Sequence, residues 1–304
     1  MLKPRPRLLW KISTRWSTTG RAGATGTALY ETPTAVSEYL EFHYASPSEI
    51  LPYGVGPVEA LNFPARCAKV CSEAVKVITQ HGRCPDTLTI TTISSQLQTK
   101  GRALDIGCAV GGASFQLARH FDQVVGVDYS EKFVEAANRM KEQGSMSYTS
   151  LIEGMITEQR TAFIPEGTNK LRQHIEFLQG DACQLQDVPL GEPFDVVLAS
   201  NLLCRLPQPR VFLQSLKTLV KVGGAAVLIS PYSWLKDYTD EAEWLGGYVD
   251  VDGYAQDSAQ GVFRVMKEEG FELMRQQPMP FLIREHRRKF QWGCSDGMTF
   301  IRIF

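Results

Sequence analysis

Apolar residues in this chain follow two spacings that alternate along its length. Five short runs are apolar at most positions and are bounded by glycine or by an acid: RALDI, VVGVD, HIEFLQ, FDVVLAS and AAVLIS, at 102–106, 124–128, 174–179, 194–200 and 225–230. Such runs are typical of strands that are buried on both faces of a parallel sheet. Between the runs, apolar residues recur every three or four positions, as in helices at 130–141 and 209–220. The alternation predicts a doubly wound α/β domain.

Two further helices are predicted ahead of the first run. Thr32 can cap the first helix, Pro33 suits its first turn, and the second helix starts near Pro64. The first helix has an apolar and aromatic face that includes Tyr39 and His43. A loop rich in glycine and proline separates the two helices and can fold over a site. We therefore expect these helices to cover the sheet as an N-terminal cap.

The chain divides into a leader and one domain. The predicted parts are a basic leader at 1–29, a helical cap at 30–100, and a core at 101–304 that contains an insertion at 142–173. The insertion is too long for an ordinary connection and suggests a short pair of strands. The core is expected to end in two antiparallel strands, 271–277 and 298–304, which are joined by a long loop.

Charge and cysteine content limit the classes of function. The leader holds six basic residues and no acid, which leaves 26 basic against 33 acidic residues, a balance of −7, in the remainder. A mildly acidic domain argues against nucleic acid as the substrate, and no apolar run approaches the ~18 residues of a membrane span. Seven cysteines without metal-like pairs favour a reducing compartment. The leader resembles a mitochondrial transit peptide, and it also fits an unstructured tail on a cytoplasmic protein.

The stretch RALDIGCAVGGASFQLAR, at 102–119, carries the main chemical signal. It predicts a strand, a tight turn and a helix, and Gly107 and Gly111 let the backbone approach a ligand where a Cβ would collide. Ligands of doubly wound sheets bind at such turns, beyond the carboxyl ends of the strands. The glycine spacing alone also fits a degenerate dinucleotide fingerprint, so it does not decide which nucleotide is bound.

Two acids narrow the choice. Asp128 ends the second run, where the hydroxyl pair of a ribose is bound, and this position fits NAD equally well. Asp105 lies two residues before Gly107, inside the turn region. A carboxylate there repels a pyrophosphate but suits the ammonium of an amino-acid tail. S-adenosylmethionine carries such a tail, and the sequence therefore favours it as the cofactor.

The order of these motifs resembles that of the class I S-adenosylmethionine-dependent methyltransferases, whose first motif is an acid followed by glycines. The match continues through FLQGDACQL, FDVVLASNLLCRL and LVKVGGAAVLIS. The resemblance implies a Rossmann-like, mostly parallel sheet with an antiparallel last strand, and it implies that Asp181 and Ala182 contact adenine. Ala109 stands where that family usually has glycine, so we expect a slightly displaced cofactor. The predicted cofactor-binding residues are Asp105, Gly107, Cys108, Ala109, Gly111, Asp128, Tyr129, Asp181, Ala182 and Asn201.

A narrower resemblance comes from segments outside these motifs. YETPTAVSEYLEFHY, NFPARCAKVC, EGMITEQRTAFIPEG and REHRRKFQWG are similar to the 4-mercaptohistidine N-methyltransferase module of ovothiol synthases. The resemblance implies methylation of a ring nitrogen of 4-mercaptohistidine (5-thiohistidine). The segment before Tyr30 holds no iron-binding sulfoxide synthase domain, so a separate sulfoxide synthase is the expected partner. The tract SNLLCRL is also similar to one in protein-histidine N-methyltransferases, and a noncatalytic methyltransferase-like module is the third alternative.

The expected acceptor pocket follows from the chemistry of an imidazole. A neutral imidazole nitrogen is already nucleophilic, so the protein has to position it rather than activate it. The predicted catalytic residues are Asn201, which would hold the ring, and Arg205. The carboxylate partner is expected to be Arg205 or one of Arg284, Arg287 and Arg288. Expected substrate-binding residues are Tyr30, Glu31, Tyr44, Tyr232, Trp234 and Arg287, with Glu31 meeting the ammonium. No metal site is predicted, because the five histidines are scattered and fit surface or packed positions.

Overall fold

The computed structural model describes residues 26–81 and 101–304. The predicted leader up to residue 25 and the polar connector at 82–100 lie outside the described residues. The first described element is the 3-10 helix η1, Gly26–Glu31. The described fold therefore begins four residues before Tyr30, within the last part of the predicted leader.

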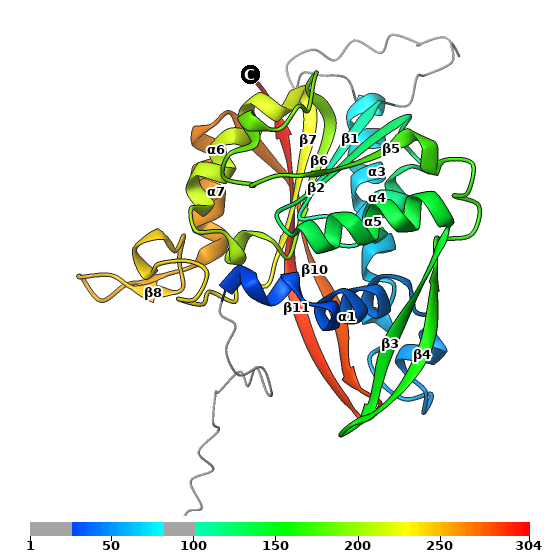
Figure 1. The fold of residues 1–304 in the computed structure, drawn as a ribbon. Coiled ribbons are helices and arrows are strands. Elements are labelled where there is room, and N and C mark those ends of the chain that lie inside the picture. The colour runs from blue at the N-terminus through cyan, green and yellow to red at the C-terminus, as the bar shows by residue number, and fades with distance from the viewer. Residues whose placement is uncertain (1–25, 82–100) are drawn as a thin grey trace, which may run out of the picture.

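A seven-stranded sheet in the order β10-β11-β7-β6-β1-β2-β5 forms the centre of the molecule (Figure 1). Its strands are β1 Arg102–Ile106, β2 Gln123–Asp128, β5 Ile175–Gln179, β6 Phe194–Ser200, β7 Val220–Ser230, β10 Phe271–His286 and β11 Lys289–Arg302. The strands from β7 to β5 pair in parallel, whereas β11 is antiparallel to both of its neighbours. This confirms the predicted fold class, including the antiparallel strand near the end of the chain.

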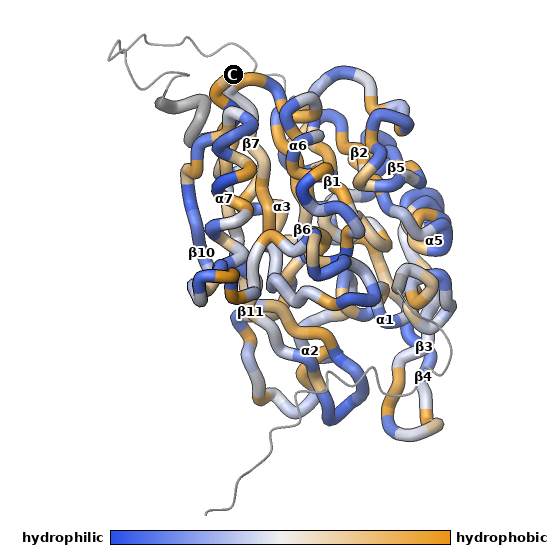
Figure 2. Tube along the Cα trace, turned by 90° about the vertical axis from the view of Figure 1, so that its left-hand side faces the viewer, coloured by the Kyte–Doolittle hydropathy of each residue, from blue (hydrophilic) through white to orange (hydrophobic). Residues whose placement is uncertain are grey.

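Helices cover both faces of the sheet. They are α1 Pro33–Tyr44, α2 Pro47–Ile50, α3 Phe63–His81, α4 Gly112–Leu117, α5 Glu131–Gln143, α6 Pro209–Leu219 and α7 Ser258–Glu268. Strand residues that alternate in sequence pack on different faces: Ala103 joins the core under α3 to α5, and Leu104 joins the core under α6 and α7. Figure 2 shows the matching hydrophobic colour along the central strands. Within residues 26–81 and 101–304, no helix has the length and apolarity of a membrane span.

Short elements complete the described chain. They are the 3-10 helices η2 Val58–Ala60, η3 Arg172–His174, η4 Leu185–Asp187, η5 Leu203–Arg205 and η6 Glu241–Glu243, and the small strand pair β8 Tyr248–Val249 and β9 Ala255–Gln256.

Side-chain caps set the helix starts where the sequence predicts them. The Thr32 hydroxyl accepts the backbone N–H of Ala35, and Pro33 opens α1. The Ser130 hydroxyl accepts the N–H of Phe133 at the start of α5. Each cap satisfies a backbone donor that has no partner within the helix. The first cap fixes α1, which bears directly on the site below.

Two sequence expectations about the later strands are wrong. The predicted loop at 278–297 is instead part of a long hairpin of β10 and β11. The pairing begins with Phe271 opposite Arg302 and ends with His286 opposite Lys289, at a two-residue turn. The prolines Pro278 and Pro280 fit a strand because β10 is the edge of the sheet and needs no ladder bond on its outer side. The fifth parallel strand also starts earlier than expected, at Val220, and it contains the glycine pair in an irregular stretch of its pairing with β6.

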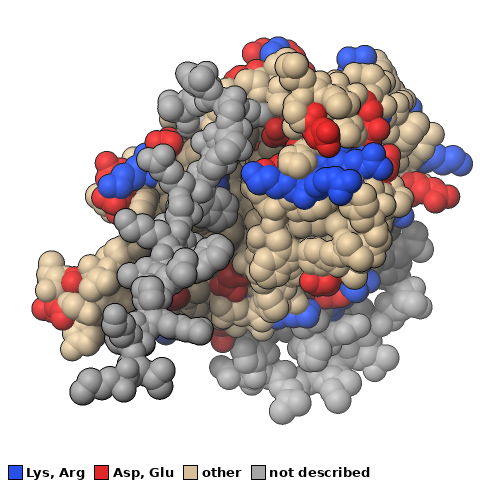
Figure 3. Space-filling model, turned by 90° about the horizontal axis from the view of Figure 1, so that it is seen from below, with Lys and Arg blue, Asp and Glu red and all other residues tan. Residues whose placement is uncertain are grey.

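The insertion forms a second hairpin beside the first. Its strands are β3 Ser145–Glu153 and β4 Ile156–Phe163, which agrees with the expected strand pair. The two hairpins project together beyond the sheet, at the end where α1 lies (Figure 1), and the Arg287 N–H donates to the Ile152 carbonyl. Viewed from below, this end of the molecule shows a band of Lys and Arg among uncharged side chains (Figure 3).

Candidate active site

A cavity of about 700 Å³ lies at the carboxyl ends of β1, β2, β5 and β6. The chain directly after these strands forms its floor, η1 and α1 cover it, and the β10/β11 hairpin and the chain after β7 form a side wall. The volume is in the range, roughly 300–1000 Å³, of pockets that hold drug-sized ligands. The predicted site residues that line it are Tyr30, Asp105, Gly107, Cys108, Ala109, Asp128, Tyr129, Asp181, Ala182, Asn201 and Arg205.

The turn after β1 uses its backbone amides inside the protein. The N–H groups of Gly107 and Cys108 donate to the Val127 carbonyl at 2.8 and 3.1 Å, and that of Ala109 donates to Asp128 Oδ2 at 2.8 Å. A pyrophosphate cradle requires such amides to face the ligand. Because these three amides are already bonded, the turn does not suit a dinucleotide, which settles the choice that the glycine spacing left open.

Ala109 adopts a backbone conformation that L residues rarely adopt. Its φ is +47°, in the left-handed region where a Cβ costs roughly 1–2 kcal/mol. Two other residues without glycine's freedom, Asn201 and Tyr232, have φ of +54° and +50° at the ends of β6 and β7. Strained backbone of this kind concentrates at functional sites, and here it lies at the carboxyl ends of adjacent strands.

Two buried carboxylates form the cofactor side of the floor. Asp105 is 1% exposed and accepts a hydrogen bond from the Ser114 hydroxyl at 2.6 Å, and burial raises its pKa to about 7. Asp128 accepts the N–H groups of Ala109 and Ser130, one on each oxygen, and burial raises its pKa to about 6. Within the described residues neither carboxylate forms an ion pair with a basic side chain. Asp105 therefore lacks a cation that a ligand's ammonium would supply, and Asp128 keeps lone pairs for ribose hydroxyls.

The far end of the floor offers groups for a nucleobase. Asp181 accepts the Cys183 N–H at 2.8 Å and follows the end of β5, and Ala182 lies beside it with 7% exposure. Tyr129 is 56% exposed at the cavity and directly follows Asp128. Carboxylates for an ammonium and a ribose, followed by a carboxylate and backbone for adenine, match the parts of S-adenosylmethionine in order. The donor set of this floor thus fits that cofactor.

Asn201 is held in its unusual conformation by the last strand. Its backbone N–H donates to the Ile229 carbonyl at 2.7 Å, and its Oδ1 accepts the hydroxyl of Ser295 at 2.7 Å. Ser295 is buried in β11, so this hydrogen bond crosses from the antiparallel strand to the end of β6. The Nδ2 amide has no hydrogen-bond partner among the described residues and can donate to a ligand, while Oδ1 keeps a second lone pair.

Arg205 lies among tyrosines at the cover of the cavity. Its Nη1 donates to the carbonyls of Cys204 and Ser233, and its guanidinium lies 5.0 Å from the centre of the Tyr238 ring. Tyr30 and Tyr39 line the cavity nearby, and both pack on Phe133. Within the described residues no Asp or Glu forms an ion pair with Arg205. Its charge is therefore available to an anionic ligand.

His43 connects the cover to the turn after β1. Its Nδ1 accepts the backbone N–H of Gly112 at 3.1 Å, and its ring packs on Tyr39 and Phe42. Burial lowers the pKa of the ring to about 3, so the ring is neutral. With Nδ1 accepting, the ring proton is on Nε2. A Cβ on Gly112 would lie 2.6 Å from Nδ1, so glycine is required for this contact.

Three predicted site residues lie outside the cavity lining because their polar groups bind elsewhere. The Tyr44 hydroxyl donates to the Val110 carbonyl at 2.6 Å, behind the turn. The Tyr232 hydroxyl donates to Asp296, and the Trp234 indole N–H donates to the Ser258 hydroxyl while its ring stacks on Trp244. These rings support the site without walling it. Their expected place is taken by Tyr39 and Tyr238.

The remaining three also differ in place from the sequence expectation. Glu31 is exposed and accepts the Lys132 N–H, outside the cavity. Arg287 lies at the turn of the β10/β11 hairpin, where its guanidinium stacks on the Tyr53 ring. Gly111 is required by packing, since a Cβ on it would lie 2.6 Å from Phe177 Cζ. The long hairpin explains the position of Arg287, which a loop would have left free to fold over the site.

Sequence reasoning missed several lining residues. Phe281, Ile283 and Gln291 reach the cavity from the hairpin that was expected to be a loop, and Thr27 reaches it from the predicted leader. The apolar run MPFLI at 279–283 was the available signal for a strand. His43 had been interpreted as a packed histidine, and its contact with Gly112, 69 positions away, has no signature in the sequence.

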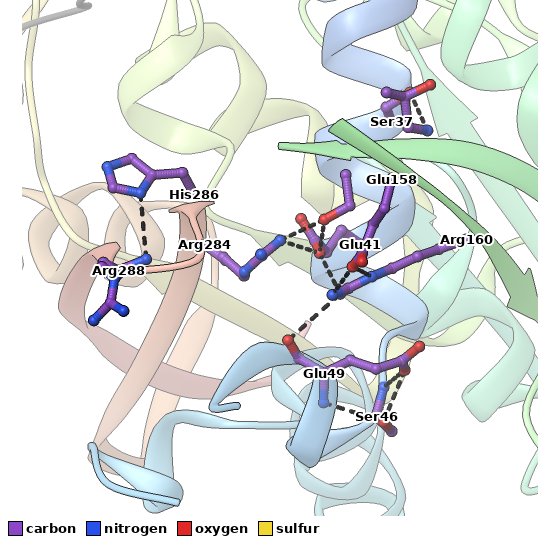
Figure 4. A network of polar contacts seen from close by, with 11 residues as sticks. Ser37, Glu41, Ser46, Glu49, Glu158, Arg160, Arg284, His286 and Arg288 are labelled. Atoms are coloured by element: carbon purple, nitrogen blue, oxygen red, sulfur yellow. Dashed lines mark hydrogen bonds and ion pairs between the residues drawn. The ribbon is translucent and has the colours of Figure 1, made fainter. Parts of the chain in front are cut away.

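A buried ionic cluster fixes α1 from the outside of the site (Figure 4). Glu41, which is 5% exposed, accepts hydrogen bonds from Arg284 at 2.6 Å, Arg160 at 2.9 Å and the Ser150 hydroxyl at 2.7 Å. The side chain of Arg284 is fully buried, and its Nε and Nη2 have no hydrogen-bond partner within residues 26–81 and 101–304. Both hairpins are thereby tied to the helix that carries His43.

The fold and the site define a class of protein, and the comparison of sequences agrees with it. Residues 104–228 match a family model described as "Methyltransferase domain". This match covers less than half of the chain. Together with the sheet order it confirms the predictions of a methyltransferase enzyme and of S-adenosylmethionine as its cofactor. Among residues 26–81 and 101–304 no group of three or more His, Cys, Asp or Glu could hold a metal ion.

The individual proteins that the chain is similar to have low sequence identity to it. The chain is 29% identical over 133 residues to "Ubiquinone biosynthesis O-methyltransferase" from strains of Coxiella burnetii, a match that covers 43% of this chain and 44% of the relative. Among solved structures, the N-terminal domain of EvdMO1 is 15% identical with a TM-score of 0.44, covering 79% of this chain and 82% of that one. A methyltransferase-like protein from Bacillus halodurans C-125 is 15% identical with a TM-score of 0.44, over 76% of this chain and 99% of that one.

Proposed function

We propose that the protein transfers a methyl group to an imidazole ring nitrogen of a small zwitterionic histidine derivative, 4-mercaptohistidine (5-thiohistidine). The observation that carries the proposal is the guanidinium of Arg205 in the cavity, without a carboxylate partner among the described residues. A partly buried charge of this kind is best matched by a ligand carboxylate, which a guanidinium can bind through two parallel hydrogen bonds. The family resemblance of the terminal segments supports the same acceptor class.

The size and cover of the cavity favour a small acceptor. About 700 Å³ must hold both the cofactor and the acceptor, and η1 and α1 lie over it. A carboxylate for an amino group is also present in the lining, since Asp237 has an exposed side chain there. An amino acid would thus find an arginine for its carboxylate and an acid for its ammonium. A histidine within a peptide has neither group, which is why the free amino acid is preferred here.

The reaction depends more on positioning the acceptor nitrogen than on acid–base catalysis. The bound cofactor supplies an electrophilic methyl group, and a neutral imidazole nitrogen attacks it in line. Arg205 fixes the acceptor's carboxylate, and the Nδ2 amide of Asn201, oriented by Ser295, donates to an acceptor atom of the substrate, such as an exocyclic sulfur that carries negative charge. The proton on the other ring nitrogen leaves to water or to an exposed carboxylate of the lining. A separate sulfoxide synthase remains the expected source of the sulfur-bearing ring.

O-methylation of a phenol is the second candidate, because the Coxiella burnetii relatives are named for it. A phenol must lose its proton before or during transfer, and the carboxylates in the lining are the bases at hand. Arg205 would then stabilise the negative charge on the reacting oxygen, so that its loss would lower kcat, whereas for an amino acid its loss would raise KM. The two candidates therefore differ in what removal of that charge would do.

Mass spectrometry of reaction products tests the proposal directly. The purified protein is incubated with S-adenosylmethionine and, separately, with 5-thiohistidine, a histidine-containing peptide, or a catechol. The proposal expects methylation of 5-thiohistidine on a ring nitrogen. It also expects Arg205→Gln to raise KM for 5-thiohistidine by about ten-fold or more, since a hydrogen bond to a charged group is lost, while cofactor affinity stays unchanged.

Arg139→Gln is the matched control, because Arg139 is exposed on α5 and contacts only Gln143 among the described side chains. It should leave KM unchanged. Methylation of the peptide or of the catechol in place of 5-thiohistidine would overturn the proposal. An Arg205→Gln enzyme with unaltered KM for 5-thiohistidine would remove the observation on which it rests.

A further inference from the structure

The cofactor's own carboxylate has no donor in the turn beneath it. In the site described above, Asp105 suits the ammonium of the methionine tail, and the carboxylate of the same tail must lie close to that ammonium. The amides of Gly107, Cys108 and Ala109 are bonded to Val127 and Asp128 and are not available. A carboxylate that leaves water needs hydrogen-bond donors in return. The Ala113 N–H, for which no hydrogen bond is found among the described residues, and the side chains of the lining are the donors that remain.

Two side chains of the lining offer a strong fixed donor, and they lie on different elements. Arg205 is bound to Cys204 and Ser233 and stacks on Tyr238, all of which follow β6 and β7. His43 instead contacts Gly112, at the start of α4, directly after the turn that holds the methionine end. Position thus separates the two donors. His43 serves the cofactor side, and Arg205 is left for the acceptor.

We propose that the Nε2–H of His43 donates a hydrogen bond to the α-carboxylate of the cofactor. The Gly112 N–H occupies Nδ1 and fixes both the tautomer and the ring orientation, as backbone contacts do for functional histidines. Among the described residues Nε2 has no hydrogen-bond partner, and the ring lines the cavity. The acceptor also carries a carboxylate, which is the other group that such a donor could bind. The inference uses the cofactor alone and does not depend on the proposed acceptor.

The helix that carries His43 is held well enough to position a ring. Glu41, two residues earlier, is clamped by Arg284 and Arg160, which belong to the two hairpins. Thr32 caps the start of the same helix, and the Tyr44 hydroxyl bonds the Val110 carbonyl at its end. These contacts lie on both sides of His43 in the sequence. The ring therefore meets the turn as a preorganised donor, which reduces the entropy lost on binding.

Two substitutions at one position separate the two ring nitrogens. His43→Asn keeps a side-chain oxygen near the place of Nδ1, which can still accept the Gly112 N–H, and it removes the donor at the place of Nε2. His43→Gln reaches the place of Nε2 with an amide N–H and leaves Gly112 without its acceptor. If His43 serves folding alone, His43→Asn should lower cofactor affinity less than His43→Gln does. If His43 binds the carboxylate, His43→Asn should lower that affinity more.

Calorimetry with a matched pair of ligands provides the readout, and it needs no catalysis. The ligands are S-adenosylhomocysteine and the same molecule without its carboxylate. His43→Asn should weaken binding of S-adenosylhomocysteine by about ten-fold or more, the effect of losing a hydrogen bond to a charged group, and should leave the decarboxylated ligand unaffected. His43→Gln should restore most of the affinity for S-adenosylhomocysteine.

Three results would overturn the assignment. An equal loss of affinity for both ligands in His43→Asn would mean that the ring only shapes the cavity. Unchanged binding of both ligands with a raised KM for the acceptor would give the donor to the acceptor's carboxylate. A loss in His43→Gln that exceeds the loss in His43→Asn would give the important role to Nδ1. Binding of the decarboxylated ligand also reports whether each variant is folded.

Discussion

Replacing Asp105 by asparagine should stabilise the protein in the absence of cofactor and weaken its affinity for the cofactor. Asp105 is 1% exposed, and its carboxylate accepts one hydrogen bond, from Ser114. Burial raises its pKa from 3.8 to about 7. A buried charge without a partner opposes folding, and the ammonium of the bound cofactor would compensate it. The same carboxylate thus destabilises the free protein and stabilises the complex with the cofactor.

The size of the effect follows from the two pKa values. The folded protein holds the Asp105 proton more tightly than the unfolded chain, so stability is greatest below pH 3.8, falls as the pH rises towards 7, and then levels off. A rise of about three units, at 1.36 kcal/mol per unit, costs the wild type about 4 kcal/mol above pH 7. Asparagine does not titrate. The variant should therefore gain on the wild type by about 1.4 kcal/mol per pH unit within that window.

A constant offset accompanies this gain. The added amide N–H group of asparagine is buried without an evident acceptor, which costs about 1–3 kcal/mol at every pH. The pH dependence of the difference is therefore the informative quantity, and the absolute difference at one pH is not. Asp128, whose pKa is raised to about 6, titrates in both proteins, so its contribution cancels from the difference.

Urea denaturation of cofactor-free protein between about pH 5 and pH 8 measures the difference. Asp122→Asn, at an exposed position just before β2, is the matched control and should show no such trend. Calorimetry should show weaker binding of S-adenosylmethionine to Asp105→Asn by about ten-fold or more, because a charge-assisted contact is lost. A difference in unfolding free energy that stays constant across the range would refute the argument from buried charge.

Two further substitutions test how the site is supported. Glu41→Gln removes the carboxylate that forms an ion pair with the buried Arg284, and it should lower the unfolding free energy by about 3–5 kcal/mol in urea titrations. Glu158→Gln, at a half-exposed pair with Arg160, should cost less than about 1 kcal/mol, and similar losses in both variants would contradict the clamp. Ala109→Gly should change stability by less than about 1 kcal/mol, because relief of left-handed strain and added chain entropy oppose each other. A thermal melt that rises or falls steeply for Ala109→Gly would show that the strain is misjudged.

The parallel part of the fold could be predicted because its signals are local. The runs that became β1, β2 and β6 are apolar at most positions, as is typical of a strand with both faces buried. Caps such as Thr32 and Ser130 mark helix starts within a few residues of sequence. The cofactor floor follows from the same signals, because each of its groups lies at or just beyond the carboxyl end of a strand. Sequence and fold therefore agree most closely where the cofactor binds.

The acceptor side could not be predicted to the same degree because its contacts are not local. The predicted loop at 278–297 is a paired hairpin, whose register depends on β11 rather than on its own pattern. Aromatic residues at strand ends, such as Tyr232, were expected in the wall, and the structure places its hydroxyl on Asp296 instead. Tyr30 and Tyr238 pack together at the cover from distant parts of the sequence. Such pairings depend on packing that no short stretch encodes.

The cofactor side and the acceptor side of the site are built from different parts of the fold, and this affects specificity. The strand ends supply the groups for the cofactor, and Asp105, Asp128 and Asp181 would serve any acceptor chemistry equally. The hairpin β10/β11 contributes Phe281 and Gln291 to the wall, and its Ser295 sets which atom of Asn201 faces the ligand. Changes along one hairpin can therefore alter both the shape of the acceptor pocket and the polarity of its amide while the cofactor floor stays intact. Acceptor preference should follow this hairpin and the α1 cover, rather than the motifs by which the class is recognised.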